Sequence, residues 1–426
     1  MKTVAVVGLG YVGLTTSIGL AQLGHKVLGF DIDVSRVSSL SAGESPIFEE
    51  GLEKALRTVL DSQNLTFADQ IQEVADFKAE FIFVCVSTPQ DESGAANLTV
   101  LNSVTSQLSV IAPPNSILVV KSTVPVGTGR RLAESIEHKD VFMASNPEFL
   151  REGTAMRDVA EPDRIVVGAN VPGVARRVLE LYEEIDCPKV ETTIESSELI
   201  KYAANAYLAM RLSFVNDIAA LAEKTHANVD EVLQGMGLDN RIGTSFLKPG
   251  PGWGGSCFPK DTSALVSMAN NVGSFLPLVE TTIVSNQAAM YRAVEAIVEL
   301  AGGVLSNKVV AVWGVAFKAH TDDVRDSPAL KIIDALLNRG ALVQAYDPIA
   351  LGPDQTGLSK YSSALQAATG ADVLAILTEW PEFSEVSPEE TTKLMRHSAV
   401  FDARRILPES WRDYASVFRV LGGTSK

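Results

Sequence analysis

The sequence predicts an α/β protein with two Rossmann-like doubly wound domains joined by a central helical segment. Three observations favour this class: a glycine-rich turn follows an apolar run at the N-terminus, residues from about 195 to 302 show helical periodicity, and apolar runs alternate with helical patterns again after residue 304. Alternating strands and helices imply parallel sheets with right-handed crossovers. We expect domain boundaries at 1–194, 195–304 and 305–426.

Five apolar runs predict the strands of the first domain: 3–7 (TVAVV), 26–33 (KVLGFDID), 80–86 (EFIFVCV), 116–121 (SILVVK) and 164–167 (RIVV). A continuous apolar run is typical of a strand that is covered on both faces. Between the first two runs, LTTSIGLAQLG has the period of a helix. This order predicts a parallel sheet at the N-terminus.

The later part of the chain changes from helices back to an α/β pattern. A Gly/Pro-rich loop at 249–259 interrupts the helical middle segment. SPALKIIDALLNRG then predicts a helix, because Pro328 lies near its first turn and Gly340 follows its end. The runs KVVAVWG, ALVQAYDP and ADVLAIL predict three strands of a second sheet.

Composition excludes several classes of protein. The 426 residues carry a net charge of −16, which argues against a nucleic-acid or anionic-membrane partner. Three scattered cysteines predict a reducing cytoplasm and no disulfide framework. We expect no metal site, since no CxxC or HxxxH spacing occurs, and no membrane span or signal peptide.

The glycine-rich turn is Gly8-Leu9-Gly10-Tyr11-Val12-Gly13, directly after a strand and at the start of a helix. In a dinucleotide fingerprint the first glycine (Gly8) makes the turn, the second (Gly10) lets the pyrophosphate approach, and the third (Gly13) packs helix on strand. The helix N-terminus would attract the phosphates.

Asp31 ends the second strand, where a carboxylate binds the adenosine ribose and repels a 2′-phosphate. We therefore expect NAD as the cofactor. Arg36 leaves an alternative open, because a nearby arginine can bind a 2′-phosphate; it can also pack against the adenine or lie on a solvated helix face.

A cysteine lies in an unusual loop, GPGWGGSCFPKD, residues 250–261. The four glycines predict an exposed and flexible setting in which the backbone of Cys257 comes close to a ligand. A thiolate beside a nicotinamide can add to an aldehyde, and the thiohemiacetal can lose a second hydride to give a thioester. Lys260 and a following helix N-terminus would favour the thiolate.

Two polar residues of the helical segment ELIKYAANAYLA are spaced to act together. Lys201 and Asn205 lie four residues apart and thus on one helix face. An ammonium and an amide there can stabilise an alkoxide. A solvated helix face is the alternative interpretation of Lys201.

Eight motifs together resemble the UDP-glucose 6-dehydrogenases of the UDP-glucose/GDP-mannose dehydrogenase family: GLGYVG, VCVSTP, KSTVPVGT, SNPEFLREG, ELIKYAANAYLA, FLKPGPGWGGSCFPKD, GVAFK and DVRDSP. They cover residues 1 to about 330 in the order of that family, and the C-terminal α/β pattern fits with weaker motifs. SCFPKD and ELIKYAAN are more similar to the UDP-glucose branch than to the GDP-mannose and UDP-N-acetylhexosamine branches. The base (UDP or TDP) and the hexose stay open.

The resemblance implies a set of catalytic residues. Cys257 matches the nucleophile, Glu148 the general base that activates water for thioester hydrolysis, and Lys201 and Asn205 the donors to the oxyanion. Asp261 would work with Lys201 and a water, and Thr123 would hold that water and touch the cofactor.

The resemblance also implies the residues that bind each ligand. For NAD these are Gly8, Gly10, Tyr11, Val12, Gly13, Asp31, Arg36, Thr88, Thr123, Glu152, Lys260 and Arg325. For the nucleotide sugar they are Glu148, Phe149, Leu150, Glu152, Lys201, Asn205, Arg241, Phe246, Leu247, Lys248, Pro249, Gly250, Gly254, Lys318 and Arg404. Arg241 and Arg404 resemble arginines that approach substrate across a subunit boundary.

Some of these residues have simpler interpretations. Glu148 can cap a helix or pair with Arg151, and Arg325 can pair with the acidic residues at 322–323. Arg405 adjoins Arg404, so either can be the relevant arginine. Cys85 is expected in the core and Cys187 in an unreactive loop, and the sequence gives Trp253 no role.

Two other classes of function compete with this interpretation. A two-electron hydroxyacid dehydrogenase shares the Rossmann-plus-helical plan but stops after one NADH. A regulatory homologue that binds the cofactor without catalysing the reaction would have lost catalytic residues. The presence of the whole catalytic set in this sequence argues against that alternative. We further expect a homodimer built on the helical middle segment, because the apolar-periodic run from Leu199 to Ala222 must bury more than one face.

Overall fold

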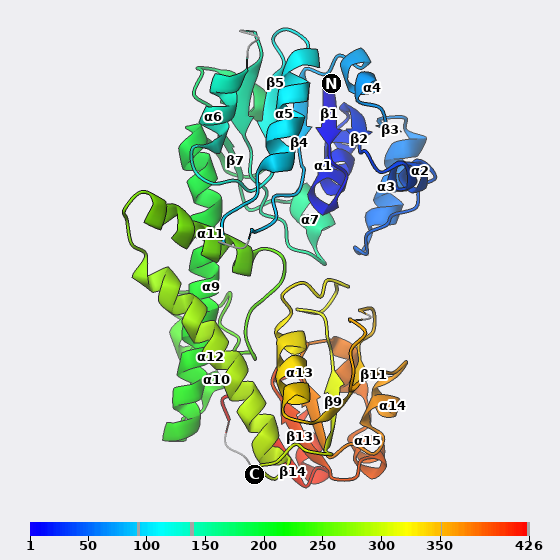
Figure 1. The fold of residues 1–426 in the computed structure, drawn as a ribbon, viewed down its shortest axis with the longest axis vertical. Coiled ribbons are helices and arrows are strands. Elements are labelled where there is room, and N and C mark those ends of the chain that lie inside the picture. Colours follow the sequence, from blue (N-terminus) through cyan, green and yellow to red (C-terminus); the bar gives the residue numbers. More distant parts are fainter. Residues whose placement is uncertain (92–93, 137–139, 351, 424–426) are drawn as a thin grey trace. The chain divides into compact units, whose positions relative to one another are not determined.

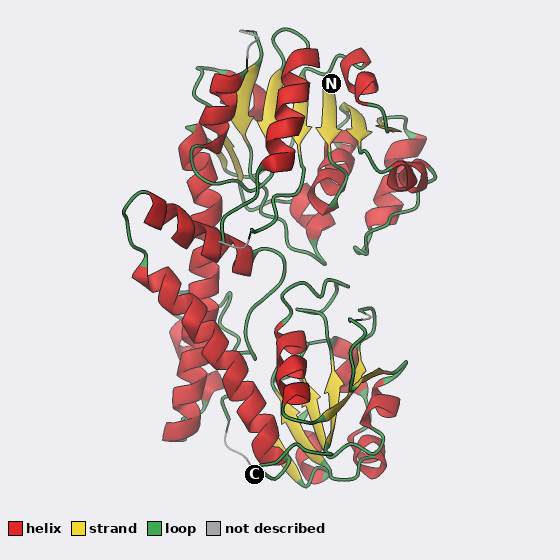
Figure 2. Cartoon of the chain, in the orientation of Figure 1, coloured by secondary structure: helices red, strands yellow, loops and turns green. Residues whose placement is uncertain are grey.

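The computed structural model describes residues 1–91, 94–136, 140–350 and 352–423. The chain divides into two compact units (Figures 1 and 2). The first contains Met1–Ala204 and Ser263–Gly273, and the second contains Asn205–Thr262 and Ser274–Lys426. Both units are built on a parallel-dominated sheet, which confirms the predicted fold class.

The sheet of the first unit has the strand order β3-β2-β1-β4-β5-β6-β7-β8. The five predicted strands are present, and three strands were missed. In chain order the strands are β1 Thr3–Val7, β2 Lys26–Phe30, β3 Leu65–Ala68, β4 Phe81–Val84, β5 Ile117–Val120, β6 Phe142–Ser145, β7 Ile165–Gly168 and β8 Lys189–Thr192.

One pairing departs from the predicted parallel sheet, because β7 runs antiparallel to β6. The last residue of β6, Ser145, pairs with the last residue of β7, Gly168, so β7 starts beyond the edge where β6 ends and runs back to it. Residues 146–164 connect the two strands on this side of the sheet. The edge where β6 ends is also the edge to which the glycine turn after β1 belongs, since β1, β4, β5 and β6 are parallel. The segment NPEFLREG is thus kept at the carboxyl ends of the parallel strands, where α/β proteins bind ligands.

Helices cover both faces of this sheet: α1 Tyr11–Gln22, α2 Val34–Ser41, α3 Leu52–Asp61, α4 Ile71–Asp76, α5 Thr99–Ile111, α6 Thr128–Ser135, α7 Ala155–Ala160 and α8 Val174–Leu179. Alternate residues of β1 enter two cores. Val4 and Val6 pack with α1 and α8, whereas Ala5 and Val7 pack with α4 and α5. A strand covered on both faces must be apolar throughout, as TVAVV is.

The second unit contains a six-stranded parallel sheet in the order β11-β10-β9-β12-β13-β14. Its strands are β9 Val309–Trp313, β10 Leu342–Tyr346, β11 Leu358–Lys360, β12 Val373–Ile376, β13 Ala399–Asp402 and β14 Val417–Val420. Its α13 Pro328–Asn338 begins at the predicted proline, and Gly340 follows with φ +85°. The shorter helices are α14 Ala364–Ala368 and α15 Pro388–Leu394.

Four helices form the middle of the chain: α9 Ile194–Thr225, α10 Val229–Gly237, α11 Phe258–Asn271 and α12 Pro277–Leu300. Within the second unit, α12 packs against α13, and its Ser285 hydroxyl donates to Asp217 of α9 at 2.7 Å. In the part of the chain that the structure describes, none of the helices combines the length and apolarity needed to cross a bilayer.

Candidate active site

The glycine turn has the backbone that a dinucleotide requires. A Cβ on Gly13 would lie 1.8 Å from the carbonyl oxygen of Gly8, so this position packs α1 closely on β1. Gly8 has φ +91°, which favours glycine. Gly10 immediately precedes α1 and has open space around its missing Cβ. The open backbone at a helix N-terminus fits a pyrophosphate.

Asp31 lies just after β2 and is largely buried. Its Oδ2 accepts a hydrogen bond from the Leu9 N–H at 2.7 Å, within the glycine turn. Arg36 donates to the same Oδ2 at 2.9 Å. The arginine is thus paired with the carboxylate that is expected to bind the ribose, and Asp31 is linked to the pyrophosphate loop.

A buried glutamate that sequence reasoning missed joins this turn to the segment after β6. Glu49 accepts hydrogen bonds from the Tyr11 hydroxyl (2.5 Å) and from the N–H groups of Gly153 (2.7 Å) and Ala155 (2.8 Å). Burial, followed by the bond to Glu49, raises the pKa of the Tyr11 phenol. Glu49 therefore fixes the backbone next to Glu152 to the expected cofactor loop.

Lys201 and Glu148 form a buried ion pair. The Nζ of Lys201 on α9 lies 2.8 Å from Oε1 of Glu148. Burial acts to raise the pKa of Glu148, but the charge and hydrogen bond of Lys201, the Leu150 N–H and the charge of Lys121 outweigh it, and the pKa lies below its usual value. Glu148 is therefore held as a carboxylate, and Lys201 does not lie on a solvated face.

The residues around Glu148 are also held in place. Arg151 pairs with Asp158 and not with Glu148, which removes one simpler interpretation of Glu148. The guanidinium of Arg164 lies 3.7 Å from the centre of the Phe149 ring. Further along the edge, the Thr88 hydroxyl donates to the Thr123 carbonyl at 2.8 Å, so two residues expected at the cofactor lie side by side.

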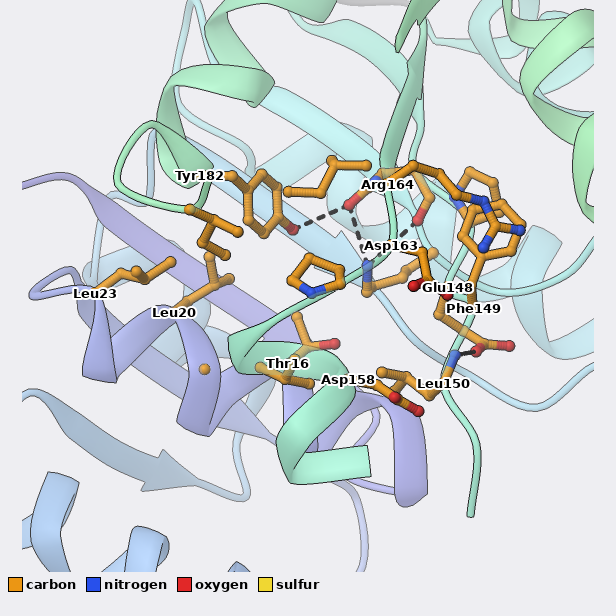
Figure 3. Close-up of a pocket in the computed structure, with 18 residues that line it drawn as sticks. Thr16, Leu20, Leu23, Glu148, Phe149, Leu150, Asp158, Asp163, Arg164 and Tyr182 are labelled. Atoms are coloured by element: carbon orange, nitrogen blue, oxygen red, sulfur yellow. Dashed lines mark hydrogen bonds between the residues drawn. The ribbon is translucent and has the colours of Figure 1, made fainter. Parts of the chain in front are cut away.

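A cavity of about 80 Å³ lies next to this ion pair (Figure 3). One wall is apolar and comes from Leu20 of α1 and from Leu23, which directly follows this helix. Glu148, Phe149 and Arg164 line another part, and Tyr182 lies on the same side of the view as Leu20 and Leu23. All of its lining residues belong to the first unit.

The cysteine loop differs from the exposed and flexible segment that was expected. Residues 249–255 are buried. The Gly250 N–H donates to Asn216 at 2.9 Å, the N–H of Trp253 donates to Asn286 at 2.8 Å, and the Trp253 indole N–H donates to Ser213 at 2.9 Å. The expectation was wrong because the glycines permit close packing. Trp253, which had no assigned role, anchors the loop to α9 and α12.

Cys257 immediately precedes α11 and is partly exposed. Its carbonyl accepts the Asp261 N–H at 2.8 Å in the first turn of the helix. The predicted helix start after the cysteine is therefore present, and a helix N-terminus favours a negative charge.

Three of the predicted polar residues lie together next to this turn. Asp261 accepts hydrogen bonds from the Asn205 amide at 2.6 Å and from the Lys260 ammonium at 2.5 Å. Asp261 is 1% exposed and Asn205 7%, so the two are held without competition from water. Lys201 and Asn205 both lie on α9, one turn apart.

The loop expected to hold the sugar nucleotide packs against the C-terminal sheet domain within the second unit. A Cβ on Gly250 would lie 3.0 Å from Nη1 of Arg404, and a Cβ on Gly254 would lie 2.1 Å from the Asp326 carbonyl. Phe246 adopts φ +58° and Leu247 is buried, whereas Lys248 is exposed. Close packing against Asp326 therefore explains the glycine at position 254, in addition to the contact with substrate that is expected there.

The structure separates the two adjacent arginines. Arg404 lies beside Gly250, and its Nε donates to the Leu377 carbonyl at 2.7 Å. Arg405 instead pairs with Asp230 of α10. Of the two, only Arg404 adjoins the loop.

Three further residues that are expected to bind ligands lie on the surface or near it. Arg325 pairs with Asp323, which agrees with its simpler interpretation, and Arg241 pairs with Asp239. The ammonium of Lys318 lies 5.5 Å from the centre of the Phe317 ring. None of these contacts identifies a ligand, so their assigned roles stay predictions.

The other two cysteines behave as expected. Cys85 is a buried member of the core, and burial raises the pKa of its thiol to about 12. Cys187 follows the α8 region in a loop, and burial also raises the pKa of its thiol. Neither is prepared to act as a nucleophile, because the thiolate is the reactive form.

A dinucleotide turn together with a separate cysteine loop fits an NAD-dependent oxidoreductase. Comparison with known proteins agrees. The sequence model of the UDP-glucose/GDP-mannose dehydrogenase family matches in three parts: the NAD binding domain at residues 2–186, the central domain at 195–288 and the UDP binding domain at 311–409. The chain belongs to this family.

Individual relatives match over nearly the whole chain. A UDP-glucose 6-dehydrogenase of Bacillus subtilis is 40% identical over 95% of this chain and 90% of its own length. One from Rhizobium meliloti is 41% identical, with 95% of both chains covered. Among solved structures, a UDP-glucose dehydrogenase from Pyrobaculum islandicum has a TM-score of 0.90 and 34% identity, with 99% of this chain and 98% of that chain covered.

Proposed function

We propose that this chain oxidises the C6 hydroxymethyl group of UDP-glucose to the carboxylate of UDP-glucuronate, with NAD as the oxidant. Membership of the family and the full-length similarity to two UDP-glucose 6-dehydrogenases support the proposal. The observation that carries it is Cys257 at the start of α11, beside the buried cluster of Asn205, Asp261 and Lys260. A two-electron hydroxyacid dehydrogenase needs no such nucleophile.

The first oxidation removes a hydride and a proton from the C6 alcohol and gives an aldehyde. Lys201 and Asn205 would donate to the developing oxyanion, and Asp261 and Thr123 would hold the water that takes the proton. When bound, NAD accepts the hydride in each of the two oxidations.

The second oxidation is covalent. The Cys257 thiolate adds to the aldehyde carbon and forms a thiohemiacetal, which loses a hydride to become a thioester. Glu148 then takes a proton from water, the water oxygen attacks the thioester carbonyl, and the C–S bond breaks to release the carboxylate and regenerate the thiol. Four electrons leave the sugar in total.

The ligand-binding roles inferred from the resemblance belong to the same proposal. NAD would contact the glycine turn, Asp31 and the Thr88–Thr123 pair. The nucleotide sugar would contact the backbone of Phe149 and Leu150 and the loop from Phe246 to Gly254, with Arg404 beside it. We also propose the three-domain division at 1–194, 195–304 and 305–426, a homodimer, and action in the cytoplasm, which three free cysteines favour.

The direct test is a count of NADH formed per sugar in a panel of UDP-glucose, TDP-glucose, GDP-mannose and UDP-N-acetylhexosamines. UDP-glucose should give the highest kcat/KM and two NADH for each molecule consumed. One NADH per molecule would instead identify a two-electron dehydrogenase, and a better substrate elsewhere in the panel would correct the sugar.

The covalent step is tested by Cys257→Ala, which should lower turnover by about three orders of magnitude or more, as loss of a covalent nucleophile does. Cys187→Ala is the matched control, because this thiol is also free and partly exposed and the proposed reaction assigns it no role. If Cys257→Ala completes both oxidations at near the unmodified rate, the covalent mechanism is wrong.

A further inference from the structure

A buried lysine lies beside the segment that carries Glu148, and the proposed reaction assigns it no role. Lys121 follows β5 directly and is 9% exposed. Its Nζ donates to Oδ1 of Asn146 at 3.1 Å. The Tyr182 hydroxyl donates to the same oxygen at 3.0 Å (Figure 3). A charged lysine is almost never buried unless something requires it.

The orientation of Asn146 is fixed by its other hydrogen bonds. Its Nδ2 donates to the Val166 carbonyl at 2.8 Å, and its own N–H donates to the Val120 carbonyl at 2.9 Å. The amide oxygen must therefore point toward Lys121 and Tyr182. Asn146 is 2% exposed and lies two residues before Glu148, so this network fixes the start of the segment.

The surroundings of the Lys121 nitrogen suit an ammonium. Its contacts are the side-chain and main-chain oxygens of Asn146, at 3.1 and 3.5 Å, and the face of Phe83, whose centre is 5.9 Å away. Oxygen acceptors and an aromatic face both attract a cation. Burial lowers the pKa of Lys121 and the charge of Lys201 lowers it further, whereas Cys85 and the charge of Glu148 act against this decrease without reversing it.

Glu148 faces charged or titratable groups from four elements. Lys201 comes from α9, Lys121 from the end of β5, and Arg164 from the residues before β7. Cys85, after β4, is a neutral thiol because burial raises its pKa to about 12. Lys201, Lys121 and Arg164 are therefore the basic groups that act on this one buried carboxylate.

The proposed reaction gives Lys201 two tasks that compete. It pairs with Glu148 at 2.8 Å here, and it would donate to the anionic substrate oxygen during the oxidations. While its ammonium serves the substrate, Glu148 loses part of its stabilisation. Lys121 cannot make this exchange, because its nitrogen is held by Asn146.

We propose that Lys121 is a positioning residue for the hydrolytic step. Its buried ammonium keeps Glu148 ionised while Lys201 serves the substrate, and its bond to Asn146 fixes the start of the segment that carries Glu148. This inference rests on the proposed function, since it concerns the base of that reaction.

The test compares four variants. Lys121→Met removes the charge and the hydrogen bond, whereas Lys121→Gln removes the charge and keeps an amide donor. Lys121→Arg keeps the charge, and the adjoining cavity of about 80 Å³ leaves room for the larger group. Tyr182→Phe is the matched control, since it removes the other donor to Asn146 and no positive charge.

The first measurement needs no activity. The infrared carboxylate band of Glu148, identified by subtracting the Glu148→Gln spectrum, is titrated against pH. Loss of the positive charge in Lys121→Met and Lys121→Gln should move the midpoint of this titration to higher pH by about one unit. This is the low end of the pKa shifts that a neighbouring opposite charge causes in a carboxylate. Lys121→Arg and Tyr182→Phe should leave the midpoint in place.

The second measurement is single-turnover hydrolysis of the thioester on Cys257. In the two uncharged variants, the acid limb of the pH–rate profile of hydrolysis should move to higher pH by the same amount. At a pH below this limb, hydrolysis should therefore be about tenfold slower. The rate of the first hydride transfer should not change. Unmoved midpoints and limbs in a folded Lys121→Gln or Lys121→Met enzyme would overturn the inference. If the unmodified enzyme forms no second NADH, the proposed function fails, and the infrared titration still reports on Lys121.

Discussion

Glu148 is a carboxylate that stays ionised inside the protein because Lys201 lies 2.8 Å away. Replacing it with glutamine leaves Cys257 intact but removes the group that would accept a proton from water. We expect Glu148→Gln to slow thioester hydrolysis about 100-fold or more, the usual contribution of a general base. A thioester should then accumulate on Cys257.

This adduct is measured as a mass increase of the intact protein after mixing with UDP-glucose and NAD. Glu161→Gln, which changes an exposed glutamate of a surface pair with Arg157, is the control and should form no lasting adduct. Fast release of product by Glu148→Gln would mean that another group activates the water.

Asp31, which we expect to determine the choice of cofactor, is linked to the glycine turn, because its carboxylate accepts hydrogen bonds from both Leu9 and Arg36. Asp31→Asn removes the negative charge that repels a 2′-phosphate and frees Arg36 to bind one. We expect kcat/KM for NAD to fall about 10- to 100-fold, the effect of losing a charged hydrogen bond, and the NADP/NAD ratio to rise.

Steady-state kinetics with both cofactors measure this ratio. Asp33→Asn is a suitable control, since Asp33 caps α2 through the Arg36 N–H and is more exposed. An unchanged ratio in Asp31→Asn would show that Asp31 does not bind the ribose.

At the scale of elements, the cysteine loop depends on glycines that pack against their neighbours. Gly254→Ala would place a Cβ 2.1 Å from the Asp326 carbonyl, a distance that forces the backbone to move. We expect it to destabilise the protein by about 1–3 kcal/mol, as overpacking does, and to lower turnover because Cys257 lies three residues further on.

Gly235→Ala in α10 provides the opposite case. Nothing lies within 4 Å of its missing Cβ, so alanine should stabilise the helix by about 0.5–1 kcal/mol and leave kcat unchanged. Chemical denaturation and turnover measure both variants. If Gly254→Ala were as stable and active as Gly235→Ala, the loop would be flexible after all.

Local patterns in the sequence were sufficient to predict the elements whose residues interact with near neighbours. TVAVV followed by GLGYVG predicted β1, the turn and α1, because an apolar strand and a glycine fingerprint are each local signals. Pro328 and Gly340 marked both ends of α13 in the same way. The helix after Cys257 was also predicted from its own residues.

Features that depend on distant residues could not be predicted in this way. Glu49 lies over 100 residues before the Gly153 and Ala155 N–H groups that it accepts from, and no local pattern distinguishes it from a surface glutamate. Trp253 reaches Ser213 on α9, so its anchoring role appears only after folding. The strand β7 was predicted, but its antiparallel direction was missed, because residue patterns give strand positions but not directions.

For the whole molecule, the central helices offer a surface that a second chain could cover. On α9, Tyr207, Phe214 and Leu221 are seven residues apart and between 51% and 58% exposed. Val284 and Tyr291 repeat this spacing on α12, with exposures of 62% and 60%. A seven-residue spacing places side chains on one helix face, and exposed apolar patches of this kind often mark protein–protein contacts.

We therefore expect a homodimer through this face, with a mass twice the 45.5 kDa of one chain in light scattering at micromolar concentration. Phe214→Glu should shift the protein toward the monomer, because a carboxylate would be buried without a partner at the interface. Val110→Glu, at an exposed apolar position on α5 of the first unit, is the matched control and should leave the mass unchanged. The double variant Tyr207→Glu/Phe214→Glu should be fully monomeric. If the unmodified protein were a monomer, the proposed dimer would be excluded. If the double variant kept the mass of the dimer, the subunit contact would lie elsewhere.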